Sequence, residues 1–199
     1  MKYRILVDAV FIHIGGGKTL LEHLLNQFEK IHDDVFFLLD KRIEKYNLIF
    51  SDENNVEYIN GSIFARHSFY KNNKYFFKNV LCLASIPPTI KLNVPVYTFF
   101  HQYSYIKLPL EESLFNKIKW FFKSIIFSKY EKNTDKWLVQ SENVKNELSK
   151  KYHINIKKIS CMPFYDSKKL ERVQIKKKKK NKFAYISFSY IYKNHYNLI

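Results

Sequence analysis

Apolar runs of strand length alternate with helix-patterned segments along most of the chain, and this alternation limits the folds that it can adopt. The opening run, Tyr3–Phe11, is almost continuously apolar, which is typical of a strand covered on both faces. The glycine triplet Gly15–Gly17 follows, and the apolar residues of 20–31 then recur at the spacing of one helix face. A second buried strand is predicted at Val35–Leu39. This order implies a parallel strand pair joined by a right-handed crossover.

The same alternation continues through the first 165 residues. Further strands are predicted at Val56–Ile59, Val80–Ala84, Val94–Phe100, Trp137–Val139 and Ile159–Met162, and helices at 62–71, 111–130 and 141–152. Ser62 and Ser141 are of a residue type that caps helix N-termini. We therefore expect residues 1–165 to form an α/β domain with a Rossmann-like, doubly wound and mostly parallel sheet.

The composition changes after this domain. Residues 166–182 contain the run Lys176–Lys180 and almost no apolar side chains, so they are interpreted as a basic, solvated linker. Phe183–Phe188 resumes as a buried strand. Residues 183–199 are expected either to add a strand to the preceding sheet or to begin a second domain, of which the chain holds the first strand and the start of a helix. In the second case the chain is the front portion of a longer protein.

The charge of the chain is strongly positive and unevenly spread. The net charge is 34 − 18 = +16, which indicates an anionic partner. Eight cations and no acid lie from Arg172 onward, so the first 171 residues carry 26 − 18 = +8. The lysine run has no aromatic stacking residues or base-reading helix beside it, and we expect no nucleic-acid partner. Cys82 and Cys161 lie in apolar runs and are expected to be buried, reduced thiols of a cytoplasmic protein.

The glycine triplet is the first candidate site. The chain has only 4 glycines, and three of them are Gly15, Gly16 and Gly17. Glycines between a first strand and a first helix let backbone N–H groups approach a phosphate or a sugar. The segment is no Walker A loop, because Ile12 stands where that motif needs a glycine, and Leu20 likewise excludes the dinucleotide fingerprint. A tight turn without functional meaning is the alternative.

Two histidines follow predicted strands. His101 comes directly after the strand 94–100, and His13 lies in the loop after the first strand. In open α/β sheets ligands bind outside the carboxyl ends of the strands, where a histidine can hydrogen-bond a sugar hydroxyl or transfer a proton. Incidental loop histidines are the alternative. The seven histidines show no paired spacing with acids, so we expect no metal site.

The predicted helix 111–130 has two apolar regions. We expect one of them to pack on the sheet; it comprises Leu114, Ile118, Phe121, Phe122 and Ile125. Trp120 and Phe127 then face outward beside Lys119 and Lys123, which suits either an anionic membrane surface or a partner domain. No uncharged stretch of about 18 residues is present, and Asp8 interrupts any signal-peptide pattern, so a cytoplasmic protein is expected. Whether it is free or peripheral on the inner face of the membrane depends on which of these two partners the helix meets.

Several of these features together resemble one family. The Gly15–Gly17 turn, His101 after a middle strand, and the segment 137–145 (Trp-Leu-Val-Gln-Ser-Glu-Asn-Val-Lys) are similar to the N-terminal domain of GT-B glycosyltransferases, in particular the retaining family four, or group 1. The passage Lys158–Phe164 and the later segment 183–199 resemble the end of that domain and the start of the second one. The resemblance thus spans essentially the whole chain.

The resemblance implies transfer of a sugar from a nucleotide-sugar to an acceptor hydroxyl, with retained configuration and without a metal or other cofactor. The acceptor is expected to be a saccharide or a lipid-linked saccharide of bacterial surface polysaccharide or lipopolysaccharide synthesis. His101 is implied as the catalytic-site residue near the transferred sugar. Lys193 is implied as the contact of the donor diphosphate, and the other substrate-binding candidates are His13, Gly15, Gly16, Gly17 and Ser141.

The sequence also departs from the family pattern. No arginine precedes Lys193 in the usual partner position, and the family's acidic Glu-x7-Glu segment has no counterpart. We therefore expect the chain to supply the acceptor-side domain and only the edge of the donor site, with little or no transferase activity on its own. A non-catalytic, Rossmann-like module that binds a nucleotide or a protein partner is the alternative.

Overall fold

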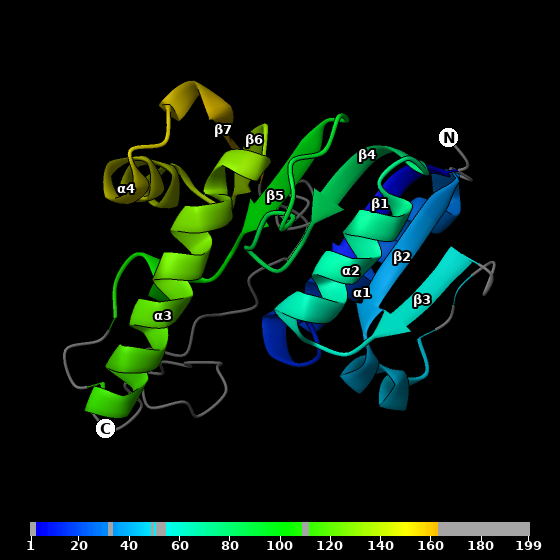
Figure 1. Cartoon of the computed structure of the whole chain (residues 1–199), viewed down its shortest axis with the longest axis horizontal. Coiled ribbons are helices and arrows are strands. Elements are labelled where there is room, and N and C mark those ends of the chain that lie inside the picture. The colour runs from blue at the N-terminus through cyan, green and yellow to red at the C-terminus, as the bar shows by residue number, and fades with distance from the viewer. Residues whose placement is uncertain (1–2, 32–33, 49, 51–54, 109–111, 163–199) are drawn as a thin grey trace, which may run out of the picture.

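The computed structural model describes residues 3–31, 34–48, 50, 55–108 and 112–162, and these form one sheet with helices on both faces (Figure 1). The sheet has seven strands in the order β3-β2-β1-β4-β5-β6-β7, and all six pairings between neighbours are parallel. The predicted α/β class with a Rossmann-like, doubly wound sheet is confirmed. The predicted linker 166–182 and the segment 183–199 lie outside the described residues.

Strands and helices alternate as the sequence predicts, with small shifts at their ends. The strands are β1 (Tyr3–Ala9), β2 (Val35–Asp40), β3 (Val56–Ile59), β4 (Phe77–Cys82), β5 (Val96–Phe100), β6 (Lys136–Val139) and β7 (Ile159–Cys161). The α-helices are α1 (Gly15–Ile31), α2 (Ile63–Asn73), α3 (Leu114–Tyr130) and α4 (Glu142–Tyr152). Short 3-10 helices are η1 (Lys41–Tyr46), η3 (Tyr103–Tyr105), η4 (Glu131–Asn133) and η5 (Ile156–Lys158).

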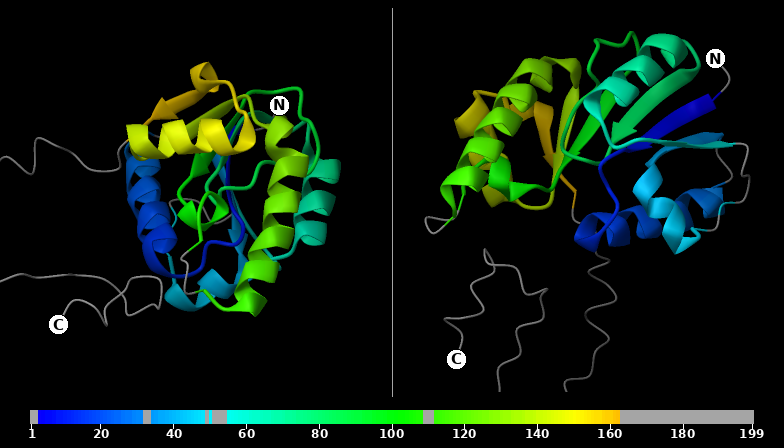
Figure 2. Two further views of the ribbon diagram at one scale, coloured as in Figure 1. Left: turned by 90° about the vertical axis from the view of Figure 1, so that its left-hand side faces the viewer. Right: turned by 60° about the horizontal axis from the view of Figure 1, so that its bottom comes forward.

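The two faces of the sheet have separate cores because strand side chains alternate between them. Leu21 and Leu25 of α1 pack on one face, against Val7 of β1 and its neighbours. Phe69 of α2 packs on the other face with Leu6. Figure 2 shows α1 on one side of the sheet and α2 and α3 on the other. Because both faces are covered, the central strands are mostly apolar, with buried polar exceptions such as Asp8 of β1.

A third cluster joins α3 and α4 to the far half of the sheet. Phe127 of α3 is fully buried and packs on Trp137 of β6, with ring centroids 5.2 Å apart. Tyr152 and Leu148 of α4 belong to the same cluster. Since large aromatic side chains bury much apolar area each, a few of them fix the position of α3.

Serine caps define where three helices begin. The hydroxyl of Ser62 accepts a hydrogen bond from the Ala65 amide, and that of Ser141 accepts one from the Val144 amide. Ser113 caps α3 in the same way, so this helix begins at Leu114 rather than at the predicted residue 111. A cap satisfies one of the amides that the first helical turn leaves without a partner.

Three predictions about local structure are wrong. The glycines 15–17 form the first turn of α1, not a turn before the helix, and Gly15 takes a left-handed φ of 63°. The faces of α3 are reversed, because the predicted core residues Leu114, Ile118, Phe121, Phe122 and Ile125 are exposed whereas Phe127 is buried. Cys82 is buried as expected, but Cys161 is only partly buried. Within the described residues, no helix has both the length and the apolar character needed to cross a bilayer.

The strand order reverses at β1, and this places the site. From β1 the chain first moves to β2 and β3 on one side and later to β4 and β5 on the other. The loops after β1 and β4 therefore leave the sheet in different directions and leave a crevice at its carboxyl edge. Such a switch point is where open α/β sheets bind ligands.

Candidate functional site

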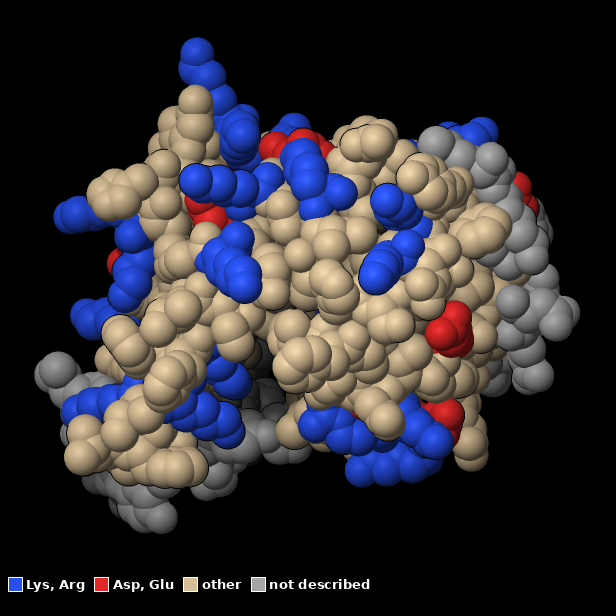
Figure 3. Space-filling model, in the orientation of Figure 1, with Lys and Arg blue, Asp and Glu red and all other residues tan. Residues whose placement is uncertain are grey.

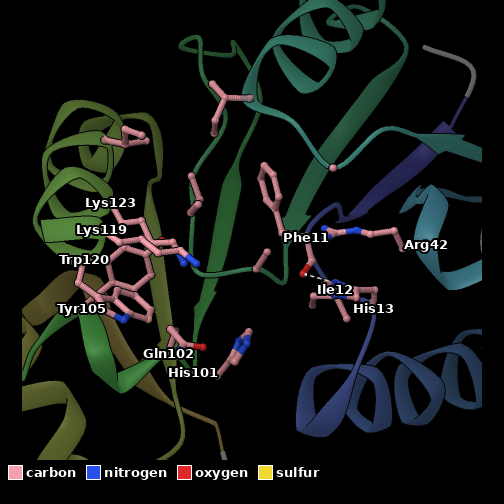
Figure 4. Close-up of a pocket in the computed structure, with 15 residues that line it drawn as sticks. Phe11, Ile12, His13, Arg42, His101, Gln102, Tyr105, Lys119, Trp120 and Lys123 are labelled. Carbon is pink, nitrogen blue, oxygen red and sulfur yellow. Dashed lines mark hydrogen bonds between the residues drawn. The ribbon is translucent and has the colours of Figure 1, made fainter. Parts of the chain in front are cut away.

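A pocket of about 640 Å³ lies at this switch point. Its walls come from the loops after β1, β3, β4 and β5 together with η1, η3 and α3, and Figure 4 shows its labelled side chains facing a common space. These loops all follow the carboxyl ends of parallel strands, so they meet at one edge of the sheet. A volume of this size is in the range of small-molecule sites.

The pocket brings together two of the predicted site residues. His13 and His101 both line it, although 88 residues separate them in the chain, and Figure 4 shows them on two different segments at the pocket. The glycines 15–17 do not line it, although α1 begins just beyond His13. Ser141 is the N-cap of α4 and is also absent from the lining. Lys193 lies outside the described residues.

His101 is held with one ring nitrogen free. Its ring stacks on Phe99, with centroids 5.9 Å apart and planes 16° from parallel. The Nδ1 atom is buried and finds no hydrogen-bond partner among the described residues. Burial lowers the pKa of His101, and a hydrogen bond to the Leu83 backbone offsets this only in part. The imidazole is therefore neutral near pH 7, and its Nδ1 keeps an unused hydrogen-bonding capacity.

Ser85 fixes the backbone on which His101 stands. Its hydroxyl accepts hydrogen bonds from the amides of His101 and Gln102, at 3.1 and 3.2 Å. Ser85 is fully buried and has a φ of 62°, in the left-handed region that non-glycine residues rarely adopt. Such strained residues cluster at functional sites, because the surrounding structure must over-determine them.

A second strained residue lies on the opposite side of the pocket. Phe11 has a φ of 79°, and its amide donates a 3.0 Å hydrogen bond to Oδ2 of the buried Asp40. His13 in turn contacts the Phe11 carbonyl oxygen through Nδ1 at 3.4 Å. The loop after β1 is therefore set by a carboxylate at the end of β2.

Asp40 also holds a cation at the pocket wall. Arg42 donates to both of its carboxylate oxygens, from Nε at 2.8 Å and from Nη2 at 2.6 Å. Burial acts to raise the pKa of Asp40, but the hydrogen bonds and charge of Arg42 and the Phe11 amide together lower it, so it stays ionised. Gly61 packs directly on this pair, since a Cβ there would lie 2.5 Å from Nη2 of Arg42.

The wall opposite Arg42 is the inner side of α3. It presents Lys119, Lys123 and Trp120, and Nζ of Lys123 lies 4.2 Å from the centre of the Trp120 ring. Partial burial and the nearby charge of Lys119 lower the pKa of Lys123. Figure 3 shows the resulting hollow with cationic side chains on both sides. No acid is among the described residues that line the pocket, so it favours an anionic ligand.

Aromatic rings complete the wall beside α3. Tyr105 of η3 meets Trp120 edge-on, with centroids 5.2 Å apart. Flat apolar surfaces next to charged donors suit a ligand with both a ring and an anionic group, such as a sugar phosphate.

Sequence analysis did not identify Arg42, the cation just after β2, or Asp40, the carboxylate that holds it. Arg42 and Asp40 lie two residues apart where a buried strand ends in an acid, and that pattern is the available signal. Gly61, the fourth glycine, follows β3 at the same sheet edge. The sequence predicts an outer face of the helix for Lys119 and Lys123, whereas the structure places both in the pocket wall.

Comparison with known proteins assigns no family to this chain. No protein-family model matches the chain, and no curated protein matches it either. Among solved structures, the chain is similar to the wall teichoic acid polymerase TagF, with 9% sequence identity and a TM-score of 0.47. The similarity covers 79% of this chain but only 37% of that chain. At this level of likeness nothing about ligands or chemistry passes from one protein to the other, so the site is interpreted from its own geometry.

Proposed function

We propose that this chain carries the acceptor-side domain of a retaining glycosyltransferase of bacterial surface-polysaccharide synthesis, with a nucleotide-sugar as donor. One observation above all supports this. The pocket at the sheet's switch point combines cations on facing walls with a neutral His101 whose Nδ1 has no hydrogen-bond partner among the described residues. The polar groups match the two parts of a sugar phosphate, a hydroxylated ring and an anionic group.

The reaction requires the bond between the anomeric carbon and the donor diphosphate oxygen to break. A bond from that carbon to the acceptor oxygen forms, and the acceptor proton leaves with the nucleoside diphosphate. Negative charge grows on the diphosphate, and preorganised cations stabilise such charge. In this proposal His101 hydrogen-bonds a hydroxyl of the transferred sugar and thereby positions the anomeric carbon.

The cations of the pocket walls define the acceptor class, whereas the family resemblance implies Lys193 as the contact of the donor diphosphate. Lys119 and Lys123 come from one wall and Arg42 from the other, so a phosphate-bearing saccharide gains contacts that a neutral saccharide lacks. We therefore infer that the acceptor carries a phosphate, and that His13 and the first turn of α1 lie beside it.

Binding of soluble probes tests this proposal. We expect UDP-glucose, GDP-mannose or glucose 1-phosphate to raise the Tm of the 199-residue chain by several degrees at about 100 times Kd, and glucose to leave it unchanged. Lys119→Gln is expected to weaken binding about tenfold. Its control, Lys157→Gln, removes an exposed charge next to β7, outside the pocket lining, and leaves binding unchanged.

Two outcomes contradict the proposal. One is the absence of a Tm shift with every nucleotide-sugar and sugar phosphate tested. The other is an equal loss of binding in the two lysine variants, because that would separate binding from the pocket. Nucleotide binding without any binding of sugar phosphates or phosphate-bearing saccharides would instead support the non-catalytic binding module.

A further inference from the structure

The outer face of α3 is an apolar stripe that no described residue covers. It consists of six exposed side chains: Leu114, Phe115, Ile118, Phe121, Phe122 and Ile125. Each of them is between 49% and 76% exposed. They recur at helical spacing over a helix of 17 residues, which is about 25 Å long. Contiguous exposed apolar surface of this kind marks an interaction site.

The fold itself does not need this stripe. The core contacts of α3 come from the opposite face, where Phe127 is fully buried and Trp120 packs on Tyr105. The stripe therefore points away from the sheet, and the helix is held in place without it. A surface that contributes nothing to the core must be explained by what it meets outside.

The charged side chains of α3 itself are all positive. The helix holds four lysines and no acid. At 100° per residue, Lys117 and Lys119 fall on the two borders of the stripe, and Lys129 lies at its C-terminal end. All three are exposed. Phenylalanines within a lysine-bordered apolar face are the composition of a helix that lies in a membrane interface.

We propose that α3 docks the protein on an anionic lipid bilayer, with its apolar stripe at the acyl boundary and its lysines among the headgroups. This inference goes beyond the proposed function and stands independently of it. It also reverses the sequence-based expectation, in which Trp120 and Phe127 face outward toward a membrane or a partner domain. Trp120, Lys119 and Lys123 line the pocket, so docking would hold the pocket within about one helix diameter, about 10 Å, of the bilayer.

Charge favours an anionic bilayer over the two other candidates that could cover the stripe, which are residues 163–199 and a second copy of the protein. Residues 163–199 contain 10 cations and 2 acids, a net charge of 10 − 2 = +8, and the lysine borders repel such a segment. A second copy of α3 would bring the same lysines together. An anionic lipid surface attracts both the borders and the basic segment, and each lysine near it contributes about fivefold to the affinity.

Vesicle flotation at low salt tests the proposal. We expect the 199-residue protein to float with vesicles of equal parts phosphatidylcholine and phosphatidylglycerol, and to stay behind with phosphatidylcholine alone. The double variant Phe121→Ser, Phe122→Ser is expected to lose at least about tenfold in vesicle affinity. Phe64→Ser is the matched control, because Phe64 is 87% exposed on α2, outside the stripe, and its loss should change nothing.

A charge variant and a folding check complete the design. Lys117→Gln, Lys129→Gln should lower the affinity about fivefold for each lysine, whereas Lys157→Gln lowers it less. Circular dichroism and an unchanged Tm confirm that the variants fold, since all changes are on the surface. Binding of glucose 1-phosphate by the phenylalanine variant separates this proposal from the proposed function, because the stripe lies outside the pocket lining.

Three results would overturn the proposal. Equal flotation with neutral and with anionic vesicles would show that charge complementarity does not drive docking. Undiminished flotation of the phenylalanine variant assigns binding to a basic segment such as Lys176–Lys180. A concentration-dependent dimer in gel filtration that the phenylalanine variant loses, without vesicle binding by the parent protein, makes the stripe an interface between two copies.

Discussion

Arg66 and Asp8 form an enclosed ion pair in which Nε of the arginine lies 2.6 Å from Oδ2 of the carboxylate and each side chain is only 1% exposed. The guanidinium also donates to the carbonyl oxygens of Ile86 and Pro87, at 2.8 and 2.7 Å. The Tyr70 hydroxyl donates to the same carboxylate. Because Ile86 lines the pocket, this network ties the centre of the sheet to the pocket rim.

Removing one partner of this pair should strongly destabilise the protein. We expect Arg66→Met to lower the free energy of unfolding by about 3–5 kcal/mol, because Asp8 is left buried without a compensating charge. Urea unfolding followed by circular dichroism measures this. The control is Lys91→Met, which breaks the exposed pair with Asp135 and should cost at most about 1 kcal/mol. Equal losses in the two variants would show that enclosure of the Arg66 pair contributes nothing.

His101 should make stability fall on the acid side. Burial places its folded-state pKa below the unfolded value of 6.5, so the unfolded chain binds more protons in the interval between them. Its contribution is therefore full above pH 6.5 and is lost as the pH falls toward the folded-state pKa. Urea unfolding between about pH 5 and pH 8 should give a wild-type minus His101→Gln difference that grows with pH and then levels off.

An exposed histidine supplies the comparison for that measurement. His23 lies on the surface of α1, and His23→Gln controls for the exchange of a histidine for a glutamine at an exposed position. A flat difference for His101→Gln, or one that grows as the pH falls, contradicts the buried and neutral state assigned to its imidazole.

The layout of the fold could be predicted from the sequence because local patterns decide it. Continuous apolar runs such as Val35–Leu39 form strands only when both faces are covered, and the helix between two such runs demands a parallel crossover. The edge of the sheet where His13 and His101 both line the pocket follows from the same rule. The pairing of Asp8 with Arg66 could not be predicted in this way, since 58 residues separate them and only the tertiary fold brings them together.

The reversed faces of α3 show where pattern reasoning fails. Helical periodicity identifies the longer apolar stripe but not which stripe meets the sheet. The inner face instead uses a few large rings, Trp120 and Phe127, beside the stems of lysines that reach the pocket. When both faces of a helix are apolar, the partner surface decides, and that surface is not local in the sequence.

Gly61 should be required for the position of Arg42. A Cβ at Gly61 would lie 2.5 Å from Nη2 of Arg42, and the buried Asp40 leaves little room to shift, so we expect Gly61→Ala to cost about 1–3 kcal/mol. The displaced guanidinium should also weaken binding of glucose 1-phosphate about tenfold. Urea unfolding and calorimetric titration measure the two effects.

Another glycine provides the matched control. At Gly16, in the first turn of α1, an added Cβ would have no neighbouring atom within 4 Å, so Gly16→Ala should stabilise the helix by up to about 1 kcal/mol. If Gly61→Ala is as harmless as Gly16→Ala, Arg42 is not held by the close packing at Gly61.

Ser85 should fix the backbone conformation of the loop that carries His101. Ser85→Ala leaves the partly buried amides of His101 and Gln102 without their acceptor, and each unpaired amide costs at most about 1–3 kcal/mol. Ser85→Gly loses the same acceptor but relieves the left-handed φ of 62°, so it should be about 1 kcal/mol more stable than Ser85→Ala. Urea unfolding of both variants, with the exposed Ser128→Ala as control, measures the two contributions separately. Both Ser85 variants should bind glucose 1-phosphate more weakly, because His101 loses its fixed position. Wild-type binding by Ser85→Ala would show that the hydroxyl supports the fold but does not position the histidine.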